Sequence, residues 1–277
     1  MKKIILSAAA ALMLLTADGQ QLKTPAPSPT QTIKQDFGLG TVELNYSRPS
    51  AKGRKIYGDL VPFGKVWRTG ANSATTITFS EAVTIGGKKV PAGKYGLLTI
   101  PDKNNWTIIL TKQLDVTSPA AYKQENDVAR VEVKSGKVDQ KVESFTMQFA
   151  NVKSTSCDLE ILWENTSVAV PITTDVETKV MAQINDLMNK DNRPYYAAAM
   201  YYMDNGKDLN QALTWFDKAI EANPKAYWVY HQKANCLAKL GKKGDAKTAA
   251  EKSKTLAAED KNDDYVKLNE KLLADLN

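Results

Sequence analysis

The densest group of residues that could do chemistry lies between Tyr46 and Asn72. This stretch carries six basic side chains and a single acidic one. Arginine makes planar, bidentate contacts with carboxylates and phosphates, and an aromatic face stacks on a sugar or a guanidinium group. These residue types therefore favour the binding of an anionic or polyhydroxylated (glycan) ligand. The predicted ligand-binding residues are Tyr46, Arg48, Lys52, Arg54, Asp59, Trp67, Arg68 and Asn72.

A purely structural interpretation of the same stretch stays open. Its four glycines permit positive φ and its two prolines fix φ, so the chain would follow a defined path without binding anything. On this interpretation Val66 and Trp67 plug the core, Arg68 pairs with Asp59 or Glu81, and the lysines are solvated. The direction in which the arginine side chains point distinguishes the two interpretations.

Few catalytic devices are compatible with the sequence. His231 is the only histidine, and it falls in the helical part, where a packing or surface role is expected. A Ser-His-Asp or Cys-His device and a histidine-based metal site are therefore excluded from the β-rich part. No phosphate-binding loop, dinucleotide fingerprint or CxxC motif is present, and we expect no cofactor. The alternative function is a hydrolase that uses converging carboxylates with Arg68 as charge stabiliser. The carboxylates considered are Glu43, Asp59, Glu81 and Glu164.

The first residues predict export. Lys2 and Lys3 precede an apolar run from Ile4 to Leu15, and Ala17-Asp18-Gly19 supplies a small-x-small cleavage pattern. The run is short for a bilayer crossing, so the mature protein is expected without a membrane span, in the periplasm or secreted. An uncleaved membrane anchor is the alternative. We predict a signal peptide over residues 1–19 and a linker over residues 20–32.

The net charge and the cysteine content indicate which partner to exclude and which state the thiols take. Removal of residues 1–19 changes the net charge from +6 to +5. Such a mild basic excess in an exported protein argues against nucleic acid as the partner. Cys157 and Cys236 fall in different predicted domains, so two buried free thiols are expected rather than one disulfide.

Residues 33–173 predict an antiparallel β domain, either a sandwich or a barrel, of which we expect the sandwich. Val42, Leu44 and Tyr46 alternate with polar residues, as in a half-buried strand. Other short strands are separated by glycine, proline and asparagine. Residues 157–163 and 168–172 flank a turn-like Glu-Asn-Thr triplet and predict a hairpin. Residues 112–127 stay unassigned.

From residue 174 to 277 the periodicity becomes helical, and Asp175 or a neighbouring threonine could cap the first helix. The sequence repeats at 34 residues: Tyr196 corresponds to Tyr230 and Ala212 to Ala246. With Phe216, Ala219 and Pro224, this region resembles the tetratricopeptide repeat family, less closely in its second unit, at Ala250 and Ser253. The resemblance implies paired helices whose concave face engages a protein partner.

The basic stretch resembles a family catalogued as domain of unknown function 2911, which occurs mainly in exported proteins. The similarity covers about residues 30–172 and continues through Trp106, Tyr122, Asp127 and Arg130 to Trp163. It implies kinship without an activity, so the expected function is non-enzymatic binding of a ligand or protein. The matching residues are Tyr46-Ser47-Arg48-Pro49, Lys52-Gly53-Arg54, Gly58-Asp59-Leu60-Val61-Pro62, Gly64-Lys65-Val66-Trp67-Arg68-Thr69-Gly70-Ala71-Asn72 and Pro91-Ala92-Gly93-Lys94-Tyr95.

Overall fold

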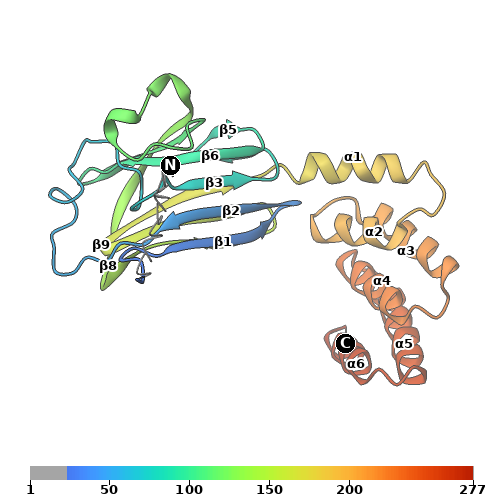
Figure 1. Cartoon of the computed structure of the whole chain (residues 1–277). Helices are drawn as coiled ribbons and strands as arrows, with labels where there is room; N and C mark the ends of the chain where they lie inside the picture. The colour runs from blue at the N-terminus through green and yellow to red at the C-terminus, as the bar shows by residue number, and fades with distance from the viewer. Residues whose placement is uncertain (1–23, 277) are drawn as a thin grey trace, which may run out of the picture. The chain divides into compact units, whose positions relative to one another are not determined.

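The computed structural model describes residues 24–276, which divide after Thr174 into a β unit and a helical unit (Figure 1). The predicted signal peptide lies outside the described residues. The predicted linker extends too far, because its last three residues, 30–32, belong to the first strand. No helix within residues 24–276 combines the length and the apolar character needed to cross a membrane.

The β unit is an antiparallel β-sandwich whose two sheets share the long strand β8 (Asp127–Ala150). The first part of β8 pairs with β7, and its later part pairs with β9. The strand order is β1-β2-β3-β6-β7-β8-β9-β4-β5. The remaining strands are β1 (Thr30–Phe37), β2 (Gly40–Ser47), β3 (Thr76–Phe79), β4 (Val83–Ile85), β5 (Lys88–Val90), β6 (Gly93–Ile100), β7 (Asn105–Thr111) and β9 (Ser156–Thr173).

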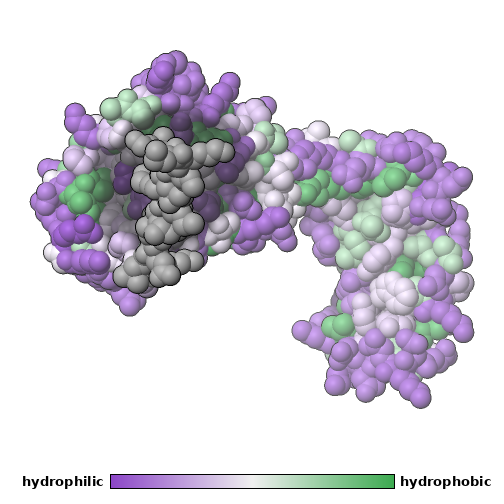
Figure 2. Space-filling view, in the orientation of Figure 1, coloured by the Kyte–Doolittle hydropathy of each residue, from purple (hydrophilic) through white to green (hydrophobic). Residues whose placement is uncertain are grey.

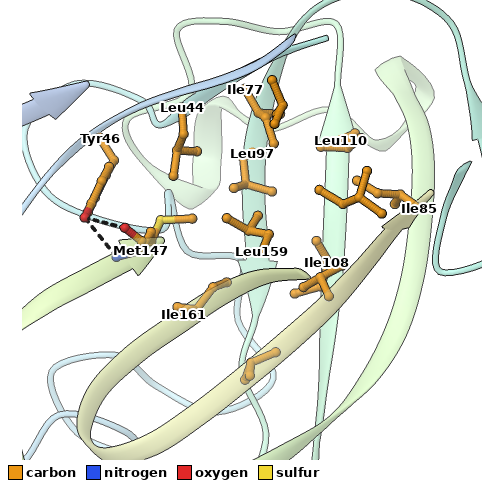
Figure 3. Close-up of a cluster of buried hydrophobic side chains, with 14 of the residues drawn as sticks. Leu44, Tyr46, Ile77, Ile85, Leu97, Ile108, Leu110, Met147, Leu159 and Ile161 are labelled. Atoms are coloured by element: carbon orange, nitrogen blue, oxygen red, sulfur yellow. Dashed lines mark hydrogen bonds between the residues drawn. The ribbon is translucent and has the colours of Figure 1, made fainter. Parts of the chain in front are cut away.

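One hydrophobic core lies between the two sheets. Leu44 and Leu97 of the first sheet meet Met147, Leu159 and Ile161 of the second (Figure 3). The alternation predicted for β2 is confirmed, since its apolar residues point into this core and are fully or almost fully buried. Burying these side chains supplies the main favourable free energy of folding for the unit.

The hairpin predicted over residues 157–172 is wrong, because β9 is one continuous strand from Ser156 to Thr173. Its partner β8 is long enough to pair with both halves. The turn-like triplet instead lies at an irregularity of the pairing, where Glu164 has a φ of 52° and the register shifts between Lys137 and Val142. Between these two pairs β8 has three more residues than β9, and such an irregularity shifts the register without reversing the chain.

Residues 112–126, unassigned from the sequence, cover the outer face of the first sheet with two short 3-10 helices, Pro119–Ala121 and Gln124–Asn126. Val116 and Tyr122 of this segment pack with Leu98 and Ile109 in a small hydrophobic cluster that is separate from the main core. The Tyr122 hydroxyl donates to the Asp127 carboxylate at 2.6 Å. These contacts hold the segment against the sheet.

Residues 175–276 of the helical unit form six α-helices, and consecutive helices from α2 to α6 pack on one another. The Asp175 carboxylate accepts from the Thr178 N–H at 3.0 Å, so the predicted cap is confirmed. Ala212, Phe216 and Ala246 are fully buried, as the repeat pattern predicted. The helices are α1 (Glu177–Leu187), α2 (Tyr195–Asp204), α3 (Leu209–Ala222), α4 (Tyr227–Lys239), α5 (Lys243–Glu259) and α6 (Asp263–Asp275).

Buried polar residues join the last three helices. His231 Nδ1 of α4 lies 2.8 Å from Asn269 Oδ1 of α6, and the Asn269 amide donates to Ser253 Oγ of α5 at 2.8 Å. The packing role predicted for His231 is therefore confirmed. Cys157 and Cys236 are both buried and free, as expected.

Candidate ligand-binding site

The stretch from Tyr46 to Asn72 is fastened to both sheets. Near its start, Ala51 N–H donates to the Glu143 carbonyl and Pro49 accepts from Phe145 N–H, each at 2.8 Å. Near its end, Trp67 exchanges two backbone hydrogen bonds with Thr99 of β6, at 2.7 and 3.0 Å. The residues between these anchors form turns rather than strands.

Two glycines are required by this path. Gly70 has a φ of 147°, and a Cβ there would lie 2.9 Å from the Ser47 carbonyl oxygen. Gly58 has a φ of 83°, and its Cβ would lie 2.6 Å from the Phe63 ring. Any larger residue would both strain the backbone and collide with a neighbour. The stretch is therefore a specified structure, as its glycine and proline content indicated.

Trp67 belongs to a cluster of five aromatic rings with Tyr57, Trp106, Phe145 and Trp163. It stacks on Trp163 at 6.0 Å with an interplanar angle of 16° and meets the edge of Phe145 at 5.1 Å. Its indole N–H donates to the Gly70 carbonyl at 3.2 Å. Trp67 thus plugs the sandwich, as the structural interpretation predicted, while its ring stays only partly buried.

The arginines of the stretch donate to neutral oxygens. Arg54 donates to the carbonyls of Ala51 at 3.0 Å and Ser50 at 2.7 Å. Arg68 donates through one terminal nitrogen to the Thr117 carbonyl, and its Nε is buried without a hydrogen-bond partner among the described residues. A buried N–H without an acceptor is unfavourable, so an oxygen of a ligand or of solvent beside this Nε would be stabilising.

Two adjacent hollows open around Arg68, and we call them together the Arg68 cleft. The first has a volume of about 310 Å³ and the second about 260 Å³. They share four residues, Leu60, Val61, Trp67 and Arg68. Arg54 and Trp163 line only the first. The residues that line only the second are Pro62, Lys65, Val66, Thr117, Ser118 and Pro119.

Three of the eight predicted binding residues, Arg54, Trp67 and Arg68, meet in the cleft. Tyr46 is instead 1% exposed, and its hydroxyl bonds the backbone of Met147 inside the sandwich. Arg48 donates to the Phe145 carbonyl at 3.1 Å and to Thr146 Oγ1 at 2.9 Å. Both side chains therefore attach β2, and the residues that directly follow it, to β8.

The other three predicted residues lie on the exposed turns of the stretch. Lys52 donates its backbone N–H to a Glu143 carboxylate oxygen at 2.7 Å. Asn72 donates through its side-chain amide to the Ser28 carbonyl at 3.0 Å. Asp59 is exposed and lines neither hollow. These residues shape the loop around the cleft without reaching it.

The carboxylates considered for catalysis are spread over the β unit. Glu43 lies exposed on β2, and Glu81 lies in the turn after β3. Glu164, on β9, is 3.5 Å from Lys141 Nζ and accepts from Ile56 N–H at 3.4 Å. In the range 24–276, no three His, Cys, Asp or Glu side chains are grouped closely enough to hold a metal ion.

Sequence reasoning missed Leu60, Val61, Trp163 and residues 117–119 as cleft residues. Trp163 could have been found, because it continues the inward-pointing alternation of Leu159 and Ile161. Residues 117–119 gave no signal, since they reach the cleft only through packing of the 112–126 segment on the sheet.

The helical unit has a separate hollow of about 450 Å³ between α3, α4 and α5. Its lining includes Leu213 and Tyr230, the lysines Lys233, Lys242 and Lys252, and the aspartates Asp217 and Asp245. One of these lysines is compensated, since Lys233 Nζ lies 2.6 Å from an Asp217 carboxylate oxygen.

Family comparisons agree with this division. Two tetratricopeptide repeat profiles match residues 193–226 and 215–248. No curated protein and no solved structure shows significant similarity to the chain. The profile described as "Protein of unknown function (DUF2911)" matches residues 28–172 and so includes the whole lining of the Arg68 cleft. Because this match covers more than half of the chain, the protein belongs to the DUF2911 family.

Proposed function

We propose that the β unit is a non-enzymatic binding module that takes a small anionic ligand in the Arg68 cleft. The observation that carries the proposal is that Arg54 and Arg68 line one cavity together with Trp67. Both guanidinium groups donate to neutral oxygens, so these bonds leave their charges uncompensated. An anion in the cavity would supply the missing charge.

The lining favours an anion over a neutral ligand. Hydrogen bonds between charged groups are stronger than neutral ones, and a guanidinium offers two parallel donors to a carboxylate or phosphate. The rings of Trp67 and Trp163 and the side chain of Leu60 contribute apolar surface beside the two charges. Apolar surface beside a few placed polar groups is typical of small-molecule sites.

The experiment measures thermal unfolding with rising concentrations of benzoate and of inorganic phosphate. We expect a saturable rise in Tm for the wild type with at least one of them, smaller at high salt. Arg68→Gln and Arg54→Gln should lose the rise. Arg48→Gln, which alters an arginine outside the cleft, should retain it. An unchanged rise in Arg68→Gln, or none in the wild type, would overturn the proposal.

The hydrolase alternative receives less support from the geometry. It requires a carboxylate beside Arg68, but Asp59 and Glu81 line neither hollow of the cleft. An Asp59→Asn variant that keeps its fold but loses hydrolysis of an ester or glycoside would restore this alternative.

We also propose that the helical unit binds a protein partner through the hollow between α3 and α5. The two tetratricopeptide repeats suggest an interaction module, and the hollow combines apolar side chains with three lysines and two aspartates. A photo-crosslinking residue at Tyr230 should yield one discrete adduct in cells of the source. The same residue at Leu268, which is exposed on α6, should yield none. Equal adducts at both positions would contradict the assignment.

Export is proposed from the sequence of residues 1–19 alone. Sequencing the N-terminus of the mature protein from its native cells tests it. Gln20 as the first residue is expected, and an intact Met1 would contradict cleavage.

A further inference from the structure

We propose that the ligand of the Arg68 cleft is an amphiphilic anion, with its charged head beside Arg54 and Arg68 and an aliphatic tail under residues 117–119. This inference rests on the proposed anion-binding function and adds the chemical class of the ligand. It is carried by the different character of the two hollows and by the residues that they share.

The first hollow has the features of a head-group site. It contains the guanidinium groups of two arginines, and its lining includes no aspartate or glutamate. Gly70 and Ala71 add backbone and small side chains, which allow close approach of a ligand oxygen. A carboxylate or phosphate would meet two positive charges here, and either head group has the required chemistry.

The second hollow has the features of a tail site. Apolar side chains dominate its lining, namely those of Leu60, Val61, Pro62, Val66 and Pro119. Lys65 is exposed, so its aliphatic stem can line the hollow while the ammonium group stays in water. Leu60 lines both hollows and is 45% exposed. An aliphatic chain would cover it.

Arg68 joins the two hollows. It lines both, and it also donates to the carbonyl of Thr117, which lines the tail hollow. This bond orients the guanidinium plane but leaves Nε without an acceptor. Each hollow alone lies at or below the low end of the size range of small-molecule sites, about 300–1,000 Å³. One ligand that spans Arg68 would use the volume of both.

The test compares carboxylates of increasing chain length by ligand-observed NMR or calorimetry, from butyrate to octanoate and below any micelle concentration. Burial of each added methylene should tighten binding by about three- to fourfold. Octyl phosphate should bind with an affinity similar to that of octanoate. Octyl glucoside, which has a neutral head, should bind much more weakly. Comparable binding of octyl glucoside and octanoate would overturn the anionic head.

Two variants separate the tail from the head. Val66→Thr keeps the shape of the side chain but adds a hydroxyl, and Ser118→Phe enlarges the cover of the tail hollow. Both variants should lower the affinity for octanoate severalfold and leave the affinity for butyrate nearly unchanged. Ser118→Ala is the neutral control. If the wild type binds octanoate no more tightly than butyrate, the amphiphile inference is overturned but the anion-binding proposal still stands. Absence of binding by every anion would overturn both.

Discussion

The hydroxyl of Tyr46 donates to the Met147 carbonyl and accepts from the Met147 N–H. The Tyr46 hydroxyl oxygen lies 2.9 Å from the carbonyl oxygen and 2.9 Å from the amide nitrogen. Residue 46 ends the inward alternation of β2, and Met147 lies in the part of β8 that pairs with β9. One side chain thus satisfies both backbone groups of a residue in the opposite sheet (Figure 3). The Tyr46 ring also meets the edge of Phe145, a member of the aromatic cluster behind the cleft.

Tyr46→Phe should lower the free energy of unfolding of the β unit by about 1–3 kcal/mol, because two buried backbone groups would lose a partner. Urea denaturation measures the change. Tyr95→Phe is the matched control, since its hydroxyl makes one bond, to the Pro91 carbonyl at 2.9 Å, and is less enclosed. A loss no larger than that of Tyr95→Phe would show that the bond between the sheets contributes little.

Gly70→Ala should destabilise the β unit by more than 2 kcal/mol, on the order of the costs of backbone strain and steric overlap combined. The added Cβ would approach the Ser47 carbonyl oxygen to 2.9 Å. Gly64→Ala provides the comparison: Gly64 has a φ of 69°, but nothing lies within 4 Å of its added Cβ. We expect about 1 kcal/mol for that variant, from strain alone. Equal losses in thermal melts of the two variants would contradict the packing of Gly70 on β2.

Cys157 should resist alkylation in the folded protein. Burial, reinforced by the neighbouring Asp158 carboxylate, raises the pKa of the Cys157 thiol to about 11. Because the thiolate is the reactive form, the fraction available at pH 8 is far below that of a free cysteine. Burial also raises the pKa of Cys236. Mass spectrometry after iodoacetamide treatment should find both thiols unmodified until denaturant unfolds the protein; rapid modification of the native form would contradict their burial.

Asn269→Ala should destabilise the helical unit by about 2–4 kcal/mol, because it removes several buried hydrogen bonds at once. The Asn269 side chain contacts His231 Nδ1, Ser253 Oγ and the Tyr265 carbonyl. Asn235→Ala on α4, whose amide donates to the nearby Gln232 side chain, should cost about 0.5 kcal/mol or less. Denaturation followed by far-UV circular dichroism compares them, and similar midpoints would refute a stabilising network.

Local patterns were sufficient for most elements of the fold. Period-two alternation found β2 and its buried residues, and the helical spacing with Ala212 and Phe216 found the paired helices. These signals are local in sequence, as is the capping by Asp175. The hairpin prediction failed because turn-like residues are also accepted at an irregularity in strand pairing. Only the length of the partner strand decides between the two.

The candidate site was predictable in part for the same reason. Composition drew attention to Arg54, Trp67 and Arg68, but it could not separate them from Arg48, which bonds to β8 over a distance of 97 residues in the chain. The contact between Arg68 and Thr117 also depends on tertiary packing. Surface composition adds little, since polar side chains cover most of the face seen in Figure 2 and hydrophobic patches are small.

Whether Arg68 receives the anion can be read from the NMR signal of its own Nε–H group. The signal can be assigned in arginine-¹⁵N-labelled protein by its disappearance in Arg68→Lys. The protein is titrated with octanoate and, separately, with inorganic phosphate. With at least one of these anions the Nε–H signal should move downfield until the site is saturated, because the unpaired donor gains an acceptor. An Nε–H signal that stays in place while both anions reach high concentrations, or a shift confined to Arg48, would show that Arg68 does not bind the anion.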